Sequence, residues 1–498
     1  MGLQVIKDQS VINSINVVES VKRWTLNFTD VINNNNKYYN MEVVKSDSNK
    51  FYLFTQYGRV GGTAAKEYRS CDSQSQAETE GEKIIKSKLK KGYVEVKLAK
   101  SDVGSEVGKT KVDSTVSVES LKRLGATVTE KDESTSKLHP QVQDLVRTWF
   151  GVTQEFIELN LDTKKCPLGQ LSVDQLDLAR QILDQARGQV SAKKPDVPEI
   201  NKLTNQYYSN IPHNFGYRRL DADALRLDTN DKIDKAFDIL EVFMGAKDVQ
   251  TVLTKKSAVD AQYATLNTDL EYLDPNSPTW KWIDAMLQET RSSNHAALGK
   301  LKLHNVFTVN RHGETDYWLK NAEKIAKECG KFTPAKIYEN LVKSRPDVDK
   351  DLQSLYKAAN ILPGWHGTRR ANMININKNG ILIRPSGVVH AGSMYGDSIY
   401  LANSSTKSIN YCDVKGSYWA QGNNKTGYMF LIDAALGNQK IATGSYMHTP
   451  QNIKPFHSVW AKGGQSGVIN DELMVYQPAG PNQQHKVRYI LEFETQAK

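Results

Sequence analysis

Cysteine is scarce in this chain, and the few cysteines that occur are far apart. They are Cys71, Cys166, Cys329 and Cys412, in a sequence of 498 residues. None of them forms a Cys-x-x-Cys pair, which argues against a structural zinc site and against a framework of disulfide bonds. We therefore expect no metal ion in this protein.

Long apolar runs are missing as well. No stretch approaches the roughly 18 consecutive apolar residues of a membrane-spanning helix, and residues 1–7 lack the pattern of a signal peptide. The hydrophobic fraction of 39% and the charged fraction of 24% are typical of a soluble globular protein. These features predict an intracellular protein without membrane contact.

Length points to several domains, and charge is spread unevenly along the chain. A chain of 498 residues exceeds what one hydrophobic core usually serves, so about two to four domains are expected. The net charge is +9, and residues 1–100 hold 16 Lys and Arg against 11 Asp and Glu. Six of these lysines, Lys86, Lys88, Lys90, Lys91, Lys97 and Lys100, cluster around Tyr93. Such a cluster suits phosphate groups, but a solvated lysine-rich helix end has the same composition.

Alternating residues predict strands near the N-terminus. The segments 39–44 and 51–55 alternate in the way of half-buried strands, and the Ser-Asp-Ser-Asn run at 46–49 supplies a turn between them. Residues 1–100 are therefore predicted to form a small β-rich domain.

Helical spacing dominates the middle of the chain. Apolar stripes occur at Val142, Leu145, Val146, Trp149 and Phe150, at Leu176, Leu178, Ile182, Leu183 and Ala186, and at Phe237, Leu240, Val242 and Phe243. Ser172 has the chemistry of an N-cap for the second stripe. We expect an all-α bundle at 137–257 with these stripes in its core. The preceding residues 101–136 are rich in small and charged side chains, which predicts a linker.

The C-terminal region, 258–498, mixes strands and helices. Strands are predicted at 306–310, 427–433, 472–476 and 486–493, and helical segments at 318–329 and 350–359. Because strand-rich segments follow helices, this region is predicted to be a mixed α+β domain. The whole chain is thus predicted to be a multidomain α+β protein.

Three residues of this region form the strongest functional pattern. His366 lies in Trp-His-Gly-Thr-Arg, Tyr400 in Ser-Ile-Tyr-Leu-Ala, and Glu472 in Asn-Asp-Glu-Leu-Met-Val-Tyr. Taken singly, each has an ordinary interpretation, namely a turn, a core tyrosine and the outward side of a strand. Ser408 and Tyr411 lie between the second and third members, and the combination predicts a functional site.

The order, spacing and context of the triplet resemble the His-Tyr-Glu signature of the poly(ADP-ribose) polymerase family. In that family these side chains hold NAD and promote transfer of its ADP-ribose. The resemblance implies an ADP-ribosyltransferase catalytic domain at 258–498, with NAD as co-substrate.

Upstream segments extend the resemblance to the same family. Tyr57-Gly58-Arg59 is similar to the WGR domain, which binds nucleic acid breaks, with tyrosine in place of tryptophan. The segments 141–145, 166–172 and 210–216 resemble the regulatory helical domain, which covers the NAD site until DNA binding loosens it. The resemblance implies DNA-binding roles for six residues: Tyr57, Arg59, Lys86, Lys88, Lys90 and Lys91.

The chemistry of NAD cleavage gives each site residue a role. Breaking the bond between nicotinamide and ribose builds positive charge on the anomeric carbon, which the Glu472 carboxylate could stabilise. Nicotinamide is a flat cation, and Tyr400 and Tyr411 are candidates to stack on it. The Gly367 backbone and the Ser408 hydroxyl would bind the carboxamide, and His366 would orient a ribose hydroxyl. Thr368, Asn372 and Arg384 complete the predicted NAD-binding set.

Several positions depart from the family pattern. Asp397-Ser398 precede Ile399-Tyr400 where the family usually has Lys-Gly, which exchanges a positive charge for a negative one. An arginine that reaches the adenosine in relatives would fall at Leu382, and Arg384 lies two positions on. The loop 444–469 is shorter than in the best-known members, and the segment 314–362 is longer, which suggests a lid or a partner surface.

These features together predict an NAD-dependent protein poly-ADP-ribosyltransferase that is activated by DNA strand breaks such as a 5′-phosphorylated nick. Its acceptors would be proteins, including itself, and we expect a monomer in isolation. Two alternatives stay open: a mono-ADP-ribosyltransferase, and a DNA-end sensor with weak catalysis. Glu472 counts against the first, because mono-transferases of the family commonly replace it, and the complete triplet counts against the second.

Overall fold

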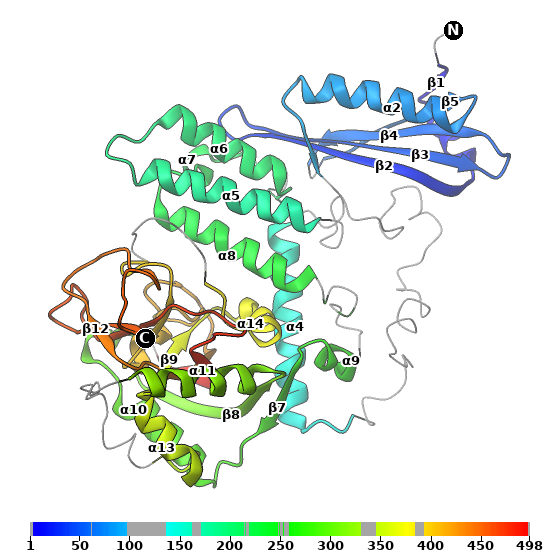
Figure 1. The fold of residues 1–498 in the computed structure, drawn as a ribbon. Coiled ribbons are helices and arrows are strands. Elements are labelled where there is room, and N and C mark those ends of the chain that lie inside the picture. Colours follow the sequence, from blue (N-terminus) through cyan, green and yellow to red (C-terminus); the bar gives the residue numbers. More distant parts are fainter. Residues whose placement is uncertain are drawn as a thin grey trace. The chain divides into compact units, whose positions relative to one another are not determined.

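The computed structural model describes most of the chain. The described residues are 3–60, 62–96, 136–161, 171–213, 215, 219–247, 249, 252, 258–329, 345–383 and 393–496. They form two compact units, one within 1–128 and 154–251 and the other within 129–153 and 252–498 (Figure 1). The predicted linker lies outside the described residues except for Ser136. The domain bounds expected from the sequence stay a prediction.

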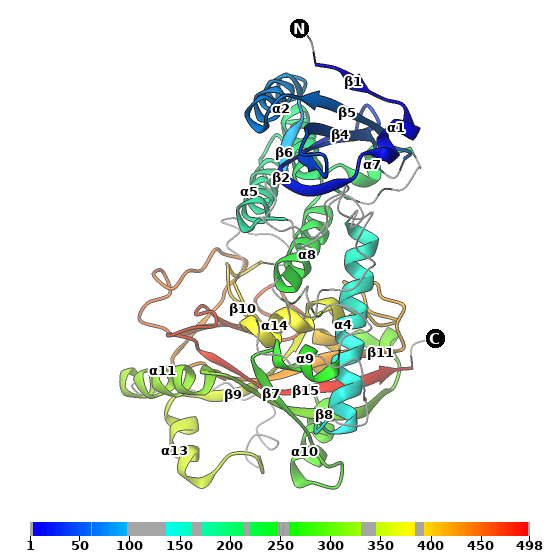
Figure 2. The ribbon, with the colours of Figure 1, turned by 90° about the vertical axis from the view of Figure 1, so that its right-hand side faces the viewer.

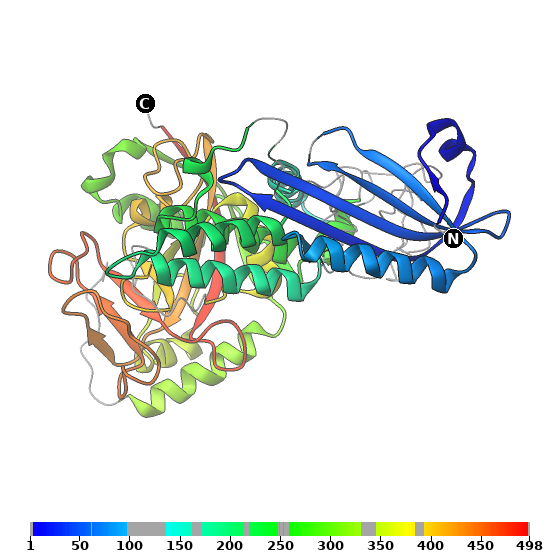
Figure 3. The same cartoon turned by 90° about the horizontal axis from the view of Figure 1, so that it is seen from above.

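The first unit begins with a six-stranded antiparallel sheet in the order β1-β5-β4-β3-β2-β6. The strands are β1 (Val5–Ile6), β2 (Val17–Asp30), β3 (Asn35–Ser46), β4 (Phe51–Arg59), β5 (Ala65–Cys71) and β6 (Val94–Val96), with a short helix α1 (Gln9–Ser14) after β1. The predicted strands lie within β3 and β4. Helix α2 (Gln74–Leu89) runs along the sheet (Figure 3). A Cβ on Gly81 of α2 would lie 2.8 Å from the Trp24 ring, so the helix can approach the sheet this closely only with glycine there.

Among the described residues, four complete helices follow in the same unit. They are α5 (Val173–Val190), α6 (Val197–Asn210), α7 (Ala222–Leu225) and α8 (Asn230–Lys247). The Ser172 side chain accepts from Gln175 N, so the predicted N-cap is confirmed. One core prediction was wrong, because Leu178 is 42% exposed whereas Leu176 and Leu183 are buried. Leu178 is two positions after Leu176 and therefore points to the opposite side of α5.

Helix α6 ends against the edge of strand β2. Within the described residues, β6 pairs with β2 only from Thr25 to Asn27, which leaves the rest of that edge to other partners. The Asn27 amide donates to the Tyr208 and Ser209 oxygens at 3.1 and 3.0 Å, and Thr29 N donates to Ser209 Oγ at 2.9 Å. The last carbonyls of a helix have no partner within it. The sheet therefore satisfies the Tyr208 and Ser209 carbonyls at the end of α6.

The second unit is built on a nine-stranded sheet in the order β12-β13-β14-β10-β9-β11-β15-β8-β7. The strands are β7 (Thr268–Tyr272), β8 (Leu301–Arg311), β9 (Ile361–Gly367), β10 (Ile399–Ala402), β11 (Thr426–Ala435), β12 (Gln439–Ile441), β13 (Ser458–Ala461), β14 (Glu472–Val475) and β15 (His485–Thr495). The helices are α9 (Val259–Ala264), α10 (Pro278–Glu289), η3 (Ser293–Leu298), α11 (Glu314–Glu328), α13 (Lys350–Ala358), η4 (Arg370–Asn372), α14 (Met373–Asn379) and α15 (Ser405–Ile409). The start of α4 (Pro140–Asn160) also belongs here. Figure 2 shows α10 beside the β8 side of the sheet, where its apolar residues join the main core. The predicted α+β class is confirmed.

Two neighbouring strands of this sheet separate at its centre. Within the described residues, β9 and β10 are paired only through Trp365 and Ala402. Strand β9 otherwise pairs with β11, from Ile361 to Gly367. His366 and Gly367 therefore lie past the point where β10 leaves β9.

The segment 314–362, which we expected to be longer than in the family, includes part of a buried ionic cluster. Its predicted helices are α11 and α13, and residues 330–344 lie outside the described part. Asp433 of β11 accepts from Arg345 at 2.6 Å, from the Tyr356 hydroxyl at 2.7 Å and from Arg488 at 3.3 Å. Burial opposes ionisation of Asp433, but the two guanidinium groups outweigh it and hold the pKa of this carboxyl below its ordinary value. A role as lid or partner surface stays a prediction.

Among the described residues, none of the helices is both long and apolar enough to cross a bilayer.

Replacing Asp433 by Asn should destabilise the second unit. The change removes one of the two carboxylates that Arg345 and Arg488 share and leaves them only Asp347 among the described residues. We therefore expect a loss near the lower end of the roughly 3–5 kcal/mol that breaking a buried ion pair costs. Chemical denaturation followed by tryptophan fluorescence measures this loss. Glu323→Gln on the exposed side of α11 is the matched control and should change the free energy of unfolding by less than about 0.5 kcal/mol. Equal stability of the two variants would show that the cluster contributes nothing.

Candidate functional site

His366 is the penultimate residue of β9. Its Nδ1 lies 3.1 Å from the backbone oxygen of Tyr400. A carbonyl oxygen can only accept, so Nδ1 carries the proton. Burial lowers the pKa of His366, and the ring is therefore neutral, with Nε2 as the acceptor. An acceptor nitrogen of fixed orientation can position a hydroxyl group.

Tyr400 of β10 is held by hydrogen bonds at its hydroxyl. The hydroxyl donates to Gly396 O at 2.9 Å and accepts from Tyr395 N at 2.9 Å. Burial raises the pKa of Tyr400, so the phenol stays neutral. Ser398, one of the departures from the family pattern, donates to the same Gly396 oxygen at 3.3 Å. The ring of Tyr400 is thus a fixed neutral surface.

Glu472 is the first residue of β14, the strand that pairs with β10. It pairs with Ala402 of β10 on one side and with Ala461 of β13 on the other. Its carboxylate forms an ion pair with Lys407 of α15, and the two side chains are 13% and 14% exposed. Lys407 also donates to Asn470 O at 3.3 Å. A largely buried carboxylate is thereby kept in place by a neighbouring cation.

The helix α15 lies directly over Gly367. A Cβ on this residue would lie 1.8 Å from the backbone oxygen of Ser408, so only glycine allows the contact. The Ser408 hydroxyl donates to Trp365 O at 3.0 Å, which leaves its oxygen able to accept. Gly367, which we expected to allow close approach of a ligand, thus also allows close approach of α15.

Further hydrogen bonds anchor α15 to the end of α10. Ser405 Oγ donates to Leu287 O at 2.8 Å, and Ser292 N donates to Thr406 Oγ1 at 2.9 Å. The Ser404 hydroxyl caps the helix by accepting from Lys407 N. Because α15 carries both Lys407 and Ser408, these bonds set their positions.

Tyr411 follows α15 and presents an aromatic face. It is 40% exposed and lies near-parallel to Trp419, with ring centroids 6.4 Å apart and an interplanar angle of 18°. Trp419 is itself 51% exposed. Two aromatic rings, one of them outside the predicted set, are therefore available for stacking beside α15.

The remaining predicted NAD-binding residues have different outcomes. Thr368 and Asn372 are buried, and the Asn372 amide donates to Thr368 Oγ1 at 3.2 Å. The Oδ1 of Asn372 has no hydrogen-bond partner among the described residues, so a ligand donor would satisfy it. Arg384 lies outside the described residues. Within those residues, no three His, Cys, Asp or Glu side chains gather as metal ligands.

The predicted DNA-binding aromatic residue, Tyr57, lies in a cluster of tyrosines on the first unit. It stacks on Tyr39 with centroids 5.0 Å apart, and its hydroxyl donates to Glu67 at 2.8 Å. The ammonium of Lys88 lies 3.9 Å from the Tyr39 ring centroid and 5.2 Å from that of Tyr93. Burial lowers the pKa of Lys88, followed by the effect of the nearby Lys91. Lys88 is thus partly withdrawn from solvent, whereas Lys86, Lys90 and Lys91 are exposed.

Arg59 contacts the β2–β3 turn. Its guanidinium donates to the backbone and side-chain oxygens of Asn34 at 2.8 and 2.9 Å. Asn34 Oδ1 also accepts from Leu220 N, in the helical part of the same unit, at 2.9 Å. Arg59 is therefore linked to the segment before α7 through one asparagine.

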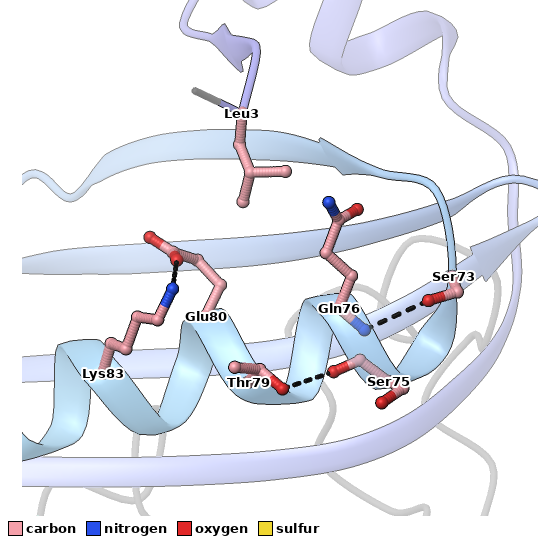
Figure 4. Close-up of a pocket in the computed structure, with 7 residues that line it drawn as sticks. All are labelled: Leu3, Ser73, Ser75, Gln76, Thr79, Glu80 and Lys83. Atoms are coloured by element: carbon pink, nitrogen blue, oxygen red, sulfur yellow. Dashed lines mark hydrogen bonds and ion pairs between the residues drawn. The ribbon is translucent and has the colours of Figure 1, made fainter. Parts of the chain in front are cut away.

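A pocket in the first unit is lined by residues that the sequence did not predict to be functional. It lies between Leu3 and the start of α2, as Figure 4 shows. Its polar groups already have partners, since Lys83 pairs with Glu80 at 3.5 Å and Ser73 accepts from Gln76 N at 3.2 Å. None of the predicted site residues is among the described residues that line it.

Three protein-family models match this chain in the order of its structural parts. The WGR domain matches residues 22–100, the "Poly(ADP-ribose) polymerase, regulatory domain" matches 136–272, and the "Poly(ADP-ribose) polymerase catalytic domain" matches 277–492. The chain belongs to the poly(ADP-ribose) polymerase family. The catalytic match contains the His366, Tyr400 and Glu472 arrangement described above.

Curated relatives agree with this assignment. The chain is 26% identical over 93% of its length to a poly [ADP-ribose] polymerase of Drosophila melanogaster, of which the match covers 42%. It is 25% identical over 88% of its length to poly [ADP-ribose] polymerase 1 of Gallus gallus, covering 40% of that protein. A match to poly [ADP-ribose] polymerase 2 of Zea mays is 25% identical and covers 57% of the relative. The chain thus spans about half the length of these polymerases.

Sequence reasoning missed Lys407 and Trp419. Lys407 directly precedes Ser408 in a segment of small polar residues. A lone lysine in such a segment was the only sequence signal that could have identified it as a site residue. Trp419 lies in an aromatic pair with Tyr418, but nothing in the spacing indicated that it stacks on Tyr411. Both contacts depend on where α15 packs.

Replacing Gly367 by Ala should weaken NAD binding without unfolding the catalytic domain. The new methyl group would collide with the Ser408 carbonyl and displace α15, and we expect NAD affinity to fall by at least about tenfold, or 1.4 kcal/mol. Titration calorimetry measures the affinity. Gly444→Ala is the matched control, because no atom lies within 4 Å of a Cβ at that position. Unchanged affinity in Gly367→Ala would contradict the assignment of this contact to the NAD site.

Proposed function

We propose that this chain is an NAD-dependent ADP-ribosyltransferase that builds poly(ADP-ribose) on protein acceptors, including itself. The observation that carries the proposal is the meeting of the triplet across three strands. His366 bonds to the backbone of Tyr400, and Glu472 begins the strand that pairs with β10. Residues up to about a hundred positions apart thus share one site, as the family signature requires.

NAD fits the residues of this site. His366 Nε2 would accept from a ribose hydroxyl, and the oxygens of Ser408 and Asn372 would accept from donors of the ligand. The rings of Tyr400 and Tyr411 offer faces for the flat nicotinamide cation. NAD supplies the ADP-ribosyl group for transfer, with nicotinamide as the leaving group.

Glu472 is the proposed catalytic carboxylate. Its negative charge would stabilise positive charge at the reacting carbon and polarise the hydroxyl that attacks it. Lys407 holds the carboxylate where it can do so, and partial burial strengthens both interactions relative to water. Retention of Glu472 favours chain elongation, and transfer of a single ADP-ribose is the second candidate function.

Glu472→Gln should abolish chain growth and leave NAD binding within about twofold of the wild type. The amide keeps the shape of the side chain but loses the charge. Sizing of labelled product on a gel measures chain length, and calorimetry measures NAD binding. Glu323→Gln provides a matched control outside the site. Full-length polymer from the Glu472 variant would remove this residue from the mechanism.

Activation by DNA breaks is the second part of the proposal. The WGR match and the exposed basic residues at the end of α2 support binding to a 5′-phosphorylated nick by Tyr57, Arg59 and the lysines. The regulatory-domain match supports restraint of the transferase until DNA binds. The protein would then act in the response to DNA damage, in the nucleus. Labelled NAD incubated with and without nicked DNA tests this, and equal turnover in both would contradict restraint.

Charge removal at the end of α2 should weaken DNA binding in a salt-dependent way. For Lys90→Gln with Lys91→Gln, we expect the slope of log affinity against log salt to fall by roughly 2, about one unit for each lost phosphate contact. Fluorescence anisotropy with a labelled nicked duplex measures the slope. Lys7→Gln with Lys50→Gln removes the same charge elsewhere in the unit and should leave the slope unchanged. Equal slopes for the two double variants would place the DNA contact elsewhere.

A further inference from the structure

His295 lies between two segments of the transferase site without belonging to either. Its Nδ1 is 3.1 Å from the side-chain amide of Asn410, and its Nε2 is 3.0 Å from the side-chain amide of Asn470. The backbone of His295 departs from helical geometry, with φ −116° and ψ 40°, and so breaks η3 in two. A half-buried histidine thus bridges two asparagines.

Each of these asparagines is next to a residue of the proposed mechanism. Asn410 immediately precedes Tyr411 and orders the loop that carries Trp419, because its Oδ1 accepts from Tyr418 N at 2.8 Å. Asn470 lies two residues before Glu472, and its backbone oxygen accepts from Lys407. The histidine therefore connects the aromatic side of the site to its carboxylate side.

The hydrogen bonds of Asn410 determine the tautomer of His295. With its Oδ1 accepting from Tyr418 N, the Asn410 amide nitrogen donates, to Thr406 O at 2.9 Å and to His295 Nδ1. Nδ1 is then an acceptor, and a neutral ring must carry its proton on Nε2. Nε2–H can only donate, so the side-chain oxygen of Asn470, and not its nitrogen, must face the ring.

The neighbourhood favours the neutral ring. Burial lowers the pKa of His295, and the positive charge of Lys407 lowers it further. The charged side chains on the two elements that contact this histidine are Lys407 of α15, and Asp471 and Glu472 at the start of β14. Glu472 is paired with Lys407, and Asp471 accepts from Trp460 Nε1 at 2.9 Å and Gly463 N at 2.8 Å.

We propose that His295, in its neutral Nε2–H form, is a positioning residue that sets the distance between the Tyr411 side of the site and the Glu472 carboxylate. Its side-chain hydrogen bonds within the described residues go to Asn410 and Asn470 and not to His366, Tyr400 or Glu472, so it acts through the two asparagines. Protonation of Nδ1 removes the acceptor that Asn410 requires and breaks the bridge. This inference rests on the proposed transferase function.

Two variants test the bridge in the full-length protein. His295→Ala and Asn470→Ala should each lower kcat by about tenfold to a hundredfold, the usual effect of displacing a catalytic group by roughly 1 Å, with KM for NAD nearly unchanged. The double variant should be no slower than either single variant, because both remove the same link. His312→Ala, an exposed histidine of the same unit, is the matched control. A change confined to KM, or additive losses in the double variant, would overturn the proposal.

The pH profile separates positioning from mere packing. His295→Asn keeps an acceptor near the place of Nδ1 but cannot titrate, so it should lose the part of the acid decline in kcat that protonation of the wild-type ring causes. Because the folded-state pKa of His295 is lowered, that decline should lie below the ordinary histidine range. An identical acid decline in the variant would contradict the inference. If His295→Ala unfolds at a markedly lower temperature than the wild type, His295→Asn and Asn470→Ala are used for the test instead.

Nitrogen NMR of the histidine-labelled wild type gives a readout that is independent of turnover. We expect the His295 ring, assigned by loss of its signals in His295→Asn, to be neutral at pH 7 with the proton on Nε2. A ring protonated on Nδ1 would overturn the bridge even in an active enzyme. Absence of any NAD turnover by the wild type would instead overturn the proposed function, and the NMR result would still decide the tautomer.

Discussion

The separation of β9 from β10 is the constraint on which the rest of the site depends. The two strands share the pair Trp365 and Ala402 and then diverge, so His366 and Gly367 leave the ladder with β10. The His366 ring fills part of the opening by donating to the Tyr400 backbone. A regular ladder at this point would use the same backbone groups for strand pairing and leave no room for a ligand.

The helix α15 completes the arrangement because it approaches β9 more closely than any residue but glycine allows. It brings Lys407 to Glu472 and Ser408 to the Trp365 carbonyl, and its anchors at Leu287 and Ser292 come from another part of the chain. Catalytic geometry of this kind is held by supporting hydrogen bonds rather than by the reacting groups alone. The bridge from Asn410 through His295 to Asn470 adds a link of the same type.

In the first unit, too, polar side chains join separate elements. Asn27 and Thr29 of β2 supply hydrogen bonds to the end of α6, and Asn34 joins Arg59 to the backbone at Leu220. Because the bonds of Asn27 and Thr29 are buried, separation of the sheet from α6 would leave unpaired polar groups.

Sequence alone predicted some of the elements and the main catalytic candidates. Periodicity located α5, α8 and segments of β3, β4, β8, β11, β14 and β15, because a buried face repeats every 3.6 or two residues. The triplet was recognised from its order, spacing and local context. The prediction from periodicity was wrong at Leu178, an apolar residue two positions from a core residue that was assigned to the core. Lys407 at Glu472, Trp419 on Tyr411 and the withdrawal of Lys88 among tyrosines were decided only by tertiary structure. Each of these contacts joins residues that local patterns treat as independent, and their distance depends on how the strands separate and the helices pack.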